Sequence, residues 1–471
     1  MTSSPVFLGM DVSSTGIKLL ATEICPATKR SLLVWETSVL YDTVMQQQPD
    51  LLDDDSKKLT ANGIRRVGDR VTVPLMLVLA ALDLILTQVS QQTEWNHRIV
   101  AISGCAQQHV CCSMALPPGS ILEPLQTTKQ DVSLPTLCHS FFSDSFASSW
   151  QDSSTAARAW CKLAEDHFGN DFLSREVGTT PFERFSLWQM LANTNSPERS
   201  QAGERSAPQC YLLLSQLITS LLCGRLVNMD RCDAGGTGLA RVNAPEWSMP
   251  LWKWLQSMDA VPCHLSPHHQ WGTIHSEAAP IEGNLCPYMR ERLFSSFSSA
   301  PSQRSLAPFV KVVAFTGDNP SIVRTYPQGI LVSMGTSVTI SAVEVEDEIS
   351  ASASTSASGS LANLDRQPNG QGFPCPYPRL ISTPPIRLQL LCFRNGTATL
   401  NLPALTGWRG DLKLEQQNRD RDIDREGLER AEECFCFDPT RAALYWEHPP
   451  IVPHVPVVGV EGCTPALQAH L

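Results

Sequence analysis

Short apolar runs broken by small polar residues predict β-hairpins and strand ends along much of this chain. Residues 6–11 form an apolar strand that ends in Asp11, and a polar turn follows at residues 12–16 before apolar residues resume at 17–21. Such a turn offers backbone amides and hydroxyls to phosphate oxygens, and Asp11 is placed to hold a magnesium-bound water. The same pattern also fits an ordinary structural hairpin.

A second hairpin of the same style is predicted over residues 329–340. Its turn carries Gly335 and Thr336 between two apolar runs, much as the first turn carries Thr15. Two polar turns of this kind, far apart in the sequence, indicate two related domains that contribute to one phosphate site.

A third apolar run, at residues 99–104, predicts a buried strand. The polar residues Gln107, Gln108 and His109 follow it closely. A strand followed by a polar cluster is the usual way to present hydrogen-bonding side chains at the carboxyl edge of a sheet. A capping turn is the structural alternative.

The apolar residues 312–314 lead into residues 315–320, which read Phe-Thr-Gly-Asp-Asn-Pro. Proline cannot continue a central strand, and Asp and Asn bond readily to nearby backbone, so a turn is predicted after the strand. In such a turn Asp318 can act as a general base while Asn319 orients a polar ligand. A plain solvent-exposed turn fits the hexapeptide equally well.

Longer stretches predict helices at residues 75–86, 153–166 and 209–222. The first is apolar, is interrupted by Asp83 and is too short to span a bilayer, so it is interpreted as a buried helix. Strands that alternate with helices favour an α/β architecture.

The composition narrows the class of protein. At 471 residues the chain is long enough for two or three domains. A net charge of −11 and a pI of about 5.5 argue against nucleic acid as a partner. We expect no membrane span and no secretory signal. The 16 cysteines are scattered without C-x-x-C spacing and are interpreted as buried thiols in a reducing cytoplasm.

Other segments are predicted to lie outside the site. Cys263 and the histidines that follow it up to His275 favour an irregular loop over a metal site. Serine-rich sequence predicts a disordered surface insertion at about residues 344–372. Residues 412–433 are highly charged and predict a solvated helix, and the proline-rich residues 449–456 predict an extended segment.

Eight segments, in order along the chain, resemble the FGGY carbohydrate kinases. They are residues 9–18, 101–109, 149–155, 182–185, 230–236, 315–320, 333–337 and 391–397. The second segment resembles the one that reaches the sugar in the eukaryotic xylulose kinase branch. The chain is identified by this resemblance as a member of the family.

The resemblance implies an α/β fold with two actin-like ATPase (ribonuclease H-like) domains around a central cleft. Residues 1–305 would form the sugar-binding domain and residues 306–471 the ATP-binding domain. It also implies a cytoplasmic phosphotransferase that uses ATP and Mg²⁺ to convert D-xylulose to D-xylulose 5-phosphate, with no nucleic-acid or membrane partner.

The resemblance also implies the roles of individual residues. Asp318 would be the general base that accepts the proton of the terminal sugar hydroxyl. The ketose ligands would be His109, Arg184, Asp318 and Asn319, and the nucleotide ligands Asp11, Thr15, Gly335, Thr336 and Trp408, with Asp11 also at the metal. Three of these residues have a structural alternative. His109 could be a core histidine, Arg184 could form an ion pair with Glu183 or a surface acid, and Trp408 could simply pack.

The sequence departs from the family at several places. Thr180 stands where a basic residue is usual, and Val338 stands where a polar residue is common. No segment matches the Gly-Gly-x-Ser loop that holds adenosine in the family, so the second domain is expected to be incomplete. A non-catalytic sugar-binding remnant and a family kinase for another sugar or polyol are therefore the alternative functions.

Overall fold

The computed structural model describes residues 4–25, 27, 31–127, 132–194, 208–242, 244–276, 280–294 and 309–318, together with the strands formed from residue 330 onward. The chain divides into two compact units, Met1–Ser321 and Ile322–Leu471. The first unit includes the strands that precede Asp318, because they pair within its sheet. The divide therefore lies later than the boundary after residue 305 that the sequence suggested.

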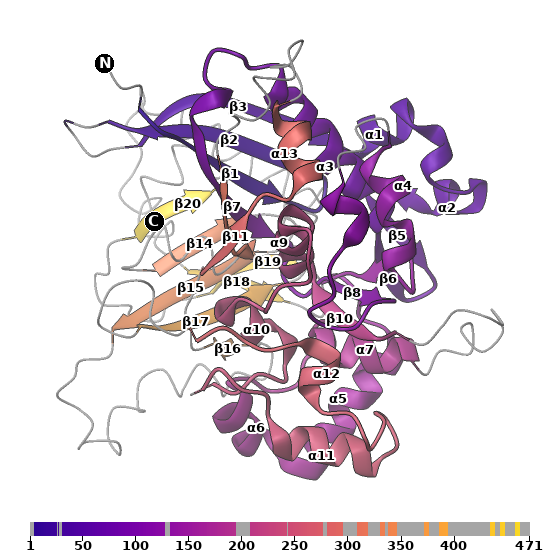
Figure 1. Ribbon diagram of the computed structural model, residues 1–471. Coiled ribbons are helices and arrows are strands. Elements are labelled where there is room, and N and C mark those ends of the chain that lie inside the picture. Colours follow the sequence, from indigo (N-terminus) through magenta and orange to yellow (C-terminus); the bar gives the residue numbers. More distant parts are fainter. Residues whose placement is uncertain are drawn as a thin grey trace, which may run out of the picture. The chain divides into compact units, whose positions relative to one another are not determined.

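The first unit is built on a seven-stranded mixed sheet with the order β11-β12-β7-β1-β2-β3, in which β13 also pairs with β7 (Figure 1). β1 and β2 form the predicted antiparallel hairpin, whereas β7 lies parallel to β1, β12 and β13. The strands of this sheet are β1 (Val6–Val12), β2 (Gly16–Ile24), β3 (Ser31–Leu40), β7 (Ile99–Ala106), β11 (Ile281–Asn284), β12 (Lys311–Val313) and β13 (Thr316–Gly317).

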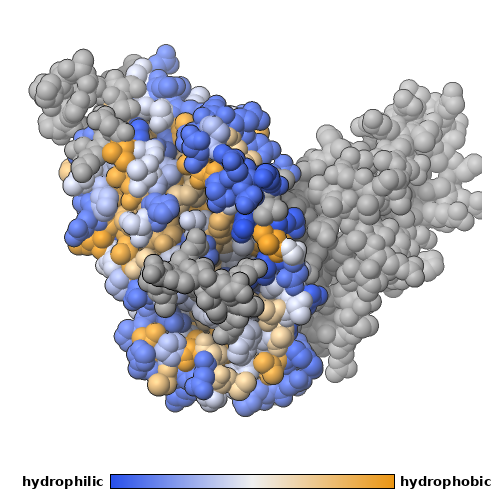
Figure 2. Space-filling view, turned by 90° about the vertical axis from the view of Figure 1, so that its right-hand side faces the viewer, coloured by the Kyte–Doolittle hydropathy of each residue, from blue (hydrophilic) through white to orange (hydrophobic). Residues whose placement is uncertain are grey.

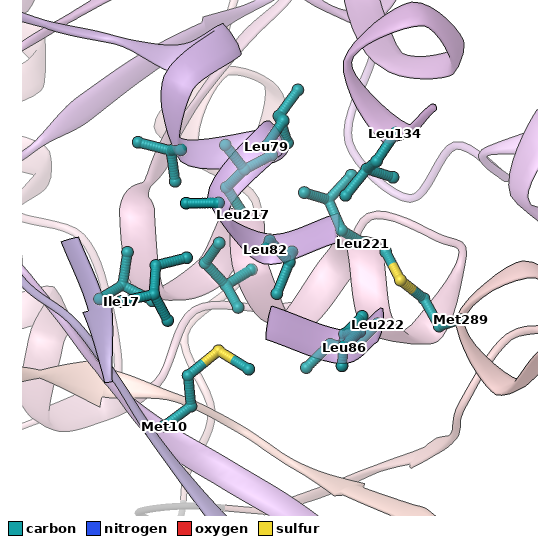
Figure 3. Close-up of a cluster of buried hydrophobic side chains, with 14 of the residues drawn as sticks. Met10, Ile17, Leu79, Leu82, Leu86, Leu134, Leu217, Leu221, Leu222 and Met289 are labelled. Carbon is teal, nitrogen blue, oxygen red and sulfur yellow. The ribbon is translucent and has the colours of Figure 1, made fainter. Parts of the chain in front are cut away.

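One face of this sheet is packed against helices. In β1 the alternate residues Val6, Leu8, Met10 and Val12 are buried, as the period of two in a strand requires. The covering helices are α3 (Leu75–Ser90), α9 (Leu214–Cys223) and α13 (Pro287–Phe294), whose apolar side chains meet those of the strands (Figures 1 and 3). The sheet and these three helices therefore form the main core of the first unit.

The predicted buried helix at residues 75–86 is confirmed as α3 and carries one acid. Asp83 is stabilised by Arg292 of α13, whose Nε lies 2.9 Å from the carboxylate. Burial raises the pKa of Asp83, and the Arg292 charge opposes that rise. The Asp83 carboxylate, which interrupts the apolar run of α3, thus links α3 to α13 through its ion pair with Arg292.

A second, six-stranded sheet has the order β10-β8-β9-β6-β5-β4. Its strands are β4 (Thr60–Ala61), β5 (Ile64–Val67), β6 (Arg70–Pro74), β8 (Cys111–Met114), β9 (Phe146–Ser148) and β10 (Cys210–Leu213). The single helix predicted over residues 209–222 is wrong at its start, because residues 210–213 pair with β8 and only then does α9 begin. Cross-strand pairing overrides the helical pattern there.

The helix predicted over residues 153–166 is confirmed as α5 (Thr155–Phe168), with the Ser154 side chain capping its first turn. The other described α-helices are α1 (Tyr41–Gln47), α2 (Asp54–Leu59), α4 (Leu134–Cys138), α6 (Asn170–Val177), α7 (Ser186–Thr194), α10 (Arg231–Ala234), α11 (Met249–Ser257) and α12 (Pro267–Trp271). Helices α5, α6, α7 and α11 lie close together in Figure 1. Where the structure describes helices, none is long and apolar enough to cross a membrane.

The mix of residues on the surface and the state of the cysteines agree with what the composition predicted. Figure 2 shows hydrophobic residues scattered among hydrophilic ones on one face of the molecule. The cysteines that the structure describes are free thiols, and most of them are buried. Cys263 is exposed and His275 bonds to Glu282, and no group of three or more metal-ligating side chains occurs among the described residues.

The second unit contains a five-stranded sheet with the order β16-β17-β15-β14-β20 and a separate pair, β18 and β19. The predicted hairpin at residues 329–340 is confirmed, since β14 and β15 are antiparallel. The strands of this unit are β14 (Ile330–Met334), β15 (Val338–Val345), β16 (Gly372–Cys375), β17 (Ile386–Phe393), β18 (Cys434–Asp438), β19 (Ala443–Glu447) and β20 (Val457–Glu461). The insertion predicted at about residues 344–372 is wrong at its ends, because residues 344 and 345 belong to β15 and residue 372 to β16. The rest of it, and the predictions for residues 412–433 and 449–456, fall outside the described residues.

Candidate active site

Three parallel strands bring the candidate residues of the first unit to one edge of its sheet. Asp11 is opposite Cys105 in the β1–β7 register, and Thr316 of β13 is opposite Cys105 on the other side. Because the carboxyl ends of parallel strands meet at the same edge, the residues that follow β7 and β13 converge there. Asp11 and Asp318, more than 300 residues apart, therefore lie at the same edge of the sheet.

Asp318 follows β13 directly and is half-buried. Its Oδ1 atom accepts a hydrogen bond of 3.3 Å from the backbone N–H of Gln108, the second residue after β7. This bond ties the carboxylate to the polar cluster after β7. The bond therefore restrains the orientation of the carboxylate, and its role as a general base stays a prediction.

The turn between β1 and β2 is held by several bonds. The backbone N–H and the hydroxyl of Ser13 both donate to the Gly16 carbonyl at 2.9 Å. The Ser13 carbonyl accepts from the Gln107 side chain at 2.9 Å and from the Tyr41 hydroxyl at 3.2 Å. Burial and the nearby Asp11 carboxylate raise the pKa of Tyr41, so its hydroxyl stays a neutral donor. These bonds fix the turn that contains Thr15 beside the strand end after β7.

Gly16 is required by close packing at this turn. A Cβ atom there would lie 2.3 Å from the Val39 carbonyl oxygen of β3.

Asp11 is half-buried at the edge of the sheet and accepts a weak hydrogen bond from the Cys105 thiol at 3.5 Å. Carboxylate, water and phosphate oxygens are the ligands that Mg²⁺ favours, so the residue type of Asp11 and its place at the sheet edge fit a magnesium ligand.

His109 is buried in a fixed orientation. Its backbone has φ of 66°, in the left-handed region, and its carbonyl accepts from the Ser186 hydroxyl at 3.2 Å. Its Nδ1 atom lies 2.7 Å from the Gly236 carbonyl, so Nδ1 carries the proton and Nε2 is left as an acceptor. The ring also packs against Phe185, with centroids 4.9 Å apart. The imidazole is thus set to accept a hydrogen bond through Nε2.

Burial, and secondarily the Arg184 charge, lower the pKa of His109 to about 3. Phe185 and Ser186, which directly follow Arg184 in the chain, both contact His109, so Arg184 lies near His109. Arg184 is itself buried, and its guanidinium lies over Phe182 at 4.5 Å and over Trp150 at 5.7 Å. A neutral imidazole acceptor and a cationic donor therefore lie near each other close to the strand end after β7.

The low pKa of His109 predicts a loss of stability in mild acid. The unfolded histidine takes up a proton near pH 6.5 and the folded one does not, so the free energy of unfolding falls as pH drops from 6.5 toward 3. The slope is about 1.4 kcal/mol per pH unit, which amounts to about 2 kcal/mol at pH 5. We expect His109→Gln to remove this part of the pH dependence in urea unfolding between pH 7 and 5.

His268→Gln is the matched control for that experiment, because it makes the same substitution at an exposed histidine of helix α12. Equal pH dependence in the wild type and in His109→Gln would show that His109 titrates normally in the folded state.

Sequence reasoning assigned no role to a segment that the structure places within the site. Asp230 caps α10, and its Oδ1 atom accepts from the Thr316 hydroxyl at 2.9 Å. Asp233 bonds to the Ser215 hydroxyl, and the Gly236 carbonyl binds His109. An acid such as Asp230 directly before a short polar helix is a capping signal that can be read from the sequence. The bond between Asp230 and Thr316 could not be predicted, because no local pattern connects these two residues.

Four candidates cannot be placed: Asn319, Gly335, Thr336 and Trp408 lie outside the described residues. Of the remaining candidates, Asp11, His109 and Asp318 lie on or directly after adjacent strands, and Arg184 lies beside His109. Thr15 is exposed in the turn after β1. The roles of all these residues remain predictions.

The fold resembles that of carbohydrate kinases whose structures are solved. The crystal structure of xylulose kinase from Rhodospirillum rubrum matches with a TM-score of 0.56 at 10% identity, over 95% of this chain and 73% of that one. This likeness establishes the α/β architecture that the sequence predicted. No protein-family model matches the chain.

The chain is homologous to xylulose kinases. It is 26% identical over 354 residues to the xylulose kinase of Saccharomyces cerevisiae, which covers 73% of this chain and 52% of the relative. It is 28% identical over 346 residues to the xylulose kinase of Rattus norvegicus, which covers 71% of this chain and 55% of the relative. The chain thus spans about half the length of these relatives.

Proposed function

We propose that this protein transfers the γ-phosphate of ATP to the terminal 5-hydroxyl of D-xylulose, forming D-xylulose 5-phosphate. The observation that carries the proposal is the convergence of Asp318 with the strand end that bears His109, in a chain homologous to xylulose kinases. Free, mostly buried thiols favour a reducing compartment, and we propose the cytoplasm.

In the proposed reaction the Asp318 carboxylate accepts the proton of the terminal sugar hydroxyl while the hydroxyl oxygen attacks the γ-phosphorus of ATP. The Nε2 atom of His109 accepts a hydrogen bond from another sugar hydroxyl, and the Arg184 guanidinium donates one to a sugar oxygen. Asn319 is proposed as a further sugar ligand. Positioning supplies much of the rate in phosphoryl transfer, so the fixed geometry of these groups matters more than a perturbed pKa of the base.

For the nucleotide, we propose Asp11 and Thr15 from the first turn, Gly335 and Thr336 from the second, and Trp408 near the base. Mg²⁺ would neutralise phosphate charge as the transferred group moves. The part of this proposal that the described residues support is the first turn, since Asp11 offers a carboxylate oxygen at the sheet edge next to fixed backbone groups.

Two measurements on the 471-residue chain test the function. We expect calorimetry to detect D-xylulose binding, and a coupled assay of ADP release to show turnover with D-xylulose above that with glycerol, gluconate or other ketoses. Preference for another sugar or polyol would overturn the assignment of substrate. Binding of D-xylulose without any binding of ATP would favour a sugar-binding protein without catalysis.

A further inference from the structure

We infer that Asp230 and Thr316 form a positioning pair. The pair holds Asp318, the proposed base, in place relative to His109, the proposed sugar ligand. Thr316 precedes Asp318 by two residues on β13, and its hydroxyl donates to Asp230 at 2.9 Å. Both residues are 2% exposed. A buried hydroxyl–carboxylate bond of this kind is charge-assisted and is costly to leave unmade.

The same carboxylate also fixes the segment that holds His109. Asp230 Oδ1 accepts from the backbone N–H groups of Cys232 at 3.0 Å and Asp233 at 3.3 Å, which sets the start of α10. This short helix leads directly to Gly236, whose carbonyl binds His109 Nδ1. One carboxylate therefore connects the backbone that orients His109 with the strand that carries Asp318.

Close packing makes this connection rigid. A Cβ atom on Gly317 would lie 2.6 Å from Asp233 Oδ1 and 3.0 Å from Gln108 Cγ. A Cβ atom on Gly236 would lie 3.0 Å from both Gln108 Nε2 and His109 Nδ1. The Gln108 side chain thus contacts both glycines, while its backbone N–H donates to Asp318. Such packing leaves little room for Asp318 to shift relative to His109 while the Asp230–Thr316 bond persists.

This inference rests on the proposed function, because it assigns the pair to the alignment of a base with its sugar. Neither residue is proposed to touch the sugar. Loss of the bond is therefore expected to slow phosphoryl transfer while sugar binding is retained, since a small misplacement of a reacting group is enough to cost rate.

Thr316→Val tests the pair because it removes the hydroxyl at nearly constant volume, whereas Thr316→Ser keeps the hydroxyl. We expect Thr316→Val to lower kcat with D-xylulose by about tenfold or more. The calorimetric Kd for the sugar should stay within about twofold, and Thr316→Ser should recover most of the turnover. Hydrogen exchange of the amides at residues 315–318 should be faster in Thr316→Val and unchanged in Thr316→Ser.

Ser220→Ala is the control for the general effect of losing a buried hydroxyl. Ser220 bonds to the Gln216 carbonyl and the Val227 N–H and touches neither β13 nor α10 in these bonds. A drop in kcat no larger in Thr316→Val than in Ser220→Ala, or a Thr316→Ser variant as impaired as Thr316→Val, would overturn the inference.

The hydrogen-exchange comparison separates this inference from the proposed function. If the wild-type chain phosphorylates no sugar, the proposed function fails, but faster exchange in Thr316→Val alone still establishes the link between Asp230 and the Asp318 strand. Equal exchange in the wild type and both Thr316 variants overturns the link, whatever the activity.

Discussion

Asp318→Asn is expected to lower kcat for D-xylulose by about 10²- to 10⁴-fold, the usual contribution of a positioned general base. Asparagine keeps the shape of the side chain, and its carbonyl oxygen can still accept from the Gln108 N–H that now donates to Asp318. It cannot take up the hydroxyl proton. The sugar should therefore bind with a similar Kd in calorimetry while ADP release in the coupled assay is nearly abolished.

Asp50→Asn makes the same chemical change at an exposed acid in the 3₁₀ helix Pro49–Leu51 after α1 and should leave kcat unaltered. Retention of wild-type turnover in Asp318→Asn, within about threefold, would rule out Asp318 as the base. Loss of both turnover and sugar binding would instead assign Asp318 mainly to substrate binding.

Gly104→Ala is expected to be the most destabilising single substitution that we propose. A Cβ atom at this position in β7 would lie 2.0 Å from the Met10 carbonyl oxygen and 2.6 Å from the Phe315 ring. The first neighbour is backbone of the adjacent strand β1 and cannot rotate away. Overpacking of this kind typically costs about 1–3 kcal/mol, and a backbone clash places Gly104→Ala at or above the upper end of that range.

The effect is measured by the urea midpoint of unfolding, with Gly9→Ala as the matched control. Gly9 lies in β1, one strand away, and a Cβ atom there would have nothing within 4 Å. We expect Gly9→Ala to be neutral or slightly stabilising, because alanine restricts the unfolded chain more than glycine does. If the two variants unfolded at the same urea concentration, the close approach of β1, β7 and Phe315 would be incorrect.

Local pattern was enough to predict several elements of the fold. The hairpin predicted over residues 6–21 and the buried helix α3 were readable because two short apolar runs around a polar turn are typical of a hairpin and because a long apolar run has few other solutions. The strand before His109 was readable as well, since its apolar run stops where polar residues begin, and β12 matches the apolar residues 312–314. The strand β13 (Thr316–Gly317) was not predicted, because it lies where a turn was expected. Propensity failed at residues 210–213, where pairing with β8 decided the conformation.

The sequence by itself therefore determined which residues are candidates for the chemistry, because residue type and position at a strand end are local properties. Only the tertiary structure decided how these residues are oriented. The Gly236 carbonyl that sets the tautomer of His109 and the Asp230–Thr316 bond each join segments that are far apart in the chain. Such contacts depend on the packing of α10 against β13, and packing between distant segments leaves no periodic signal in a single sequence.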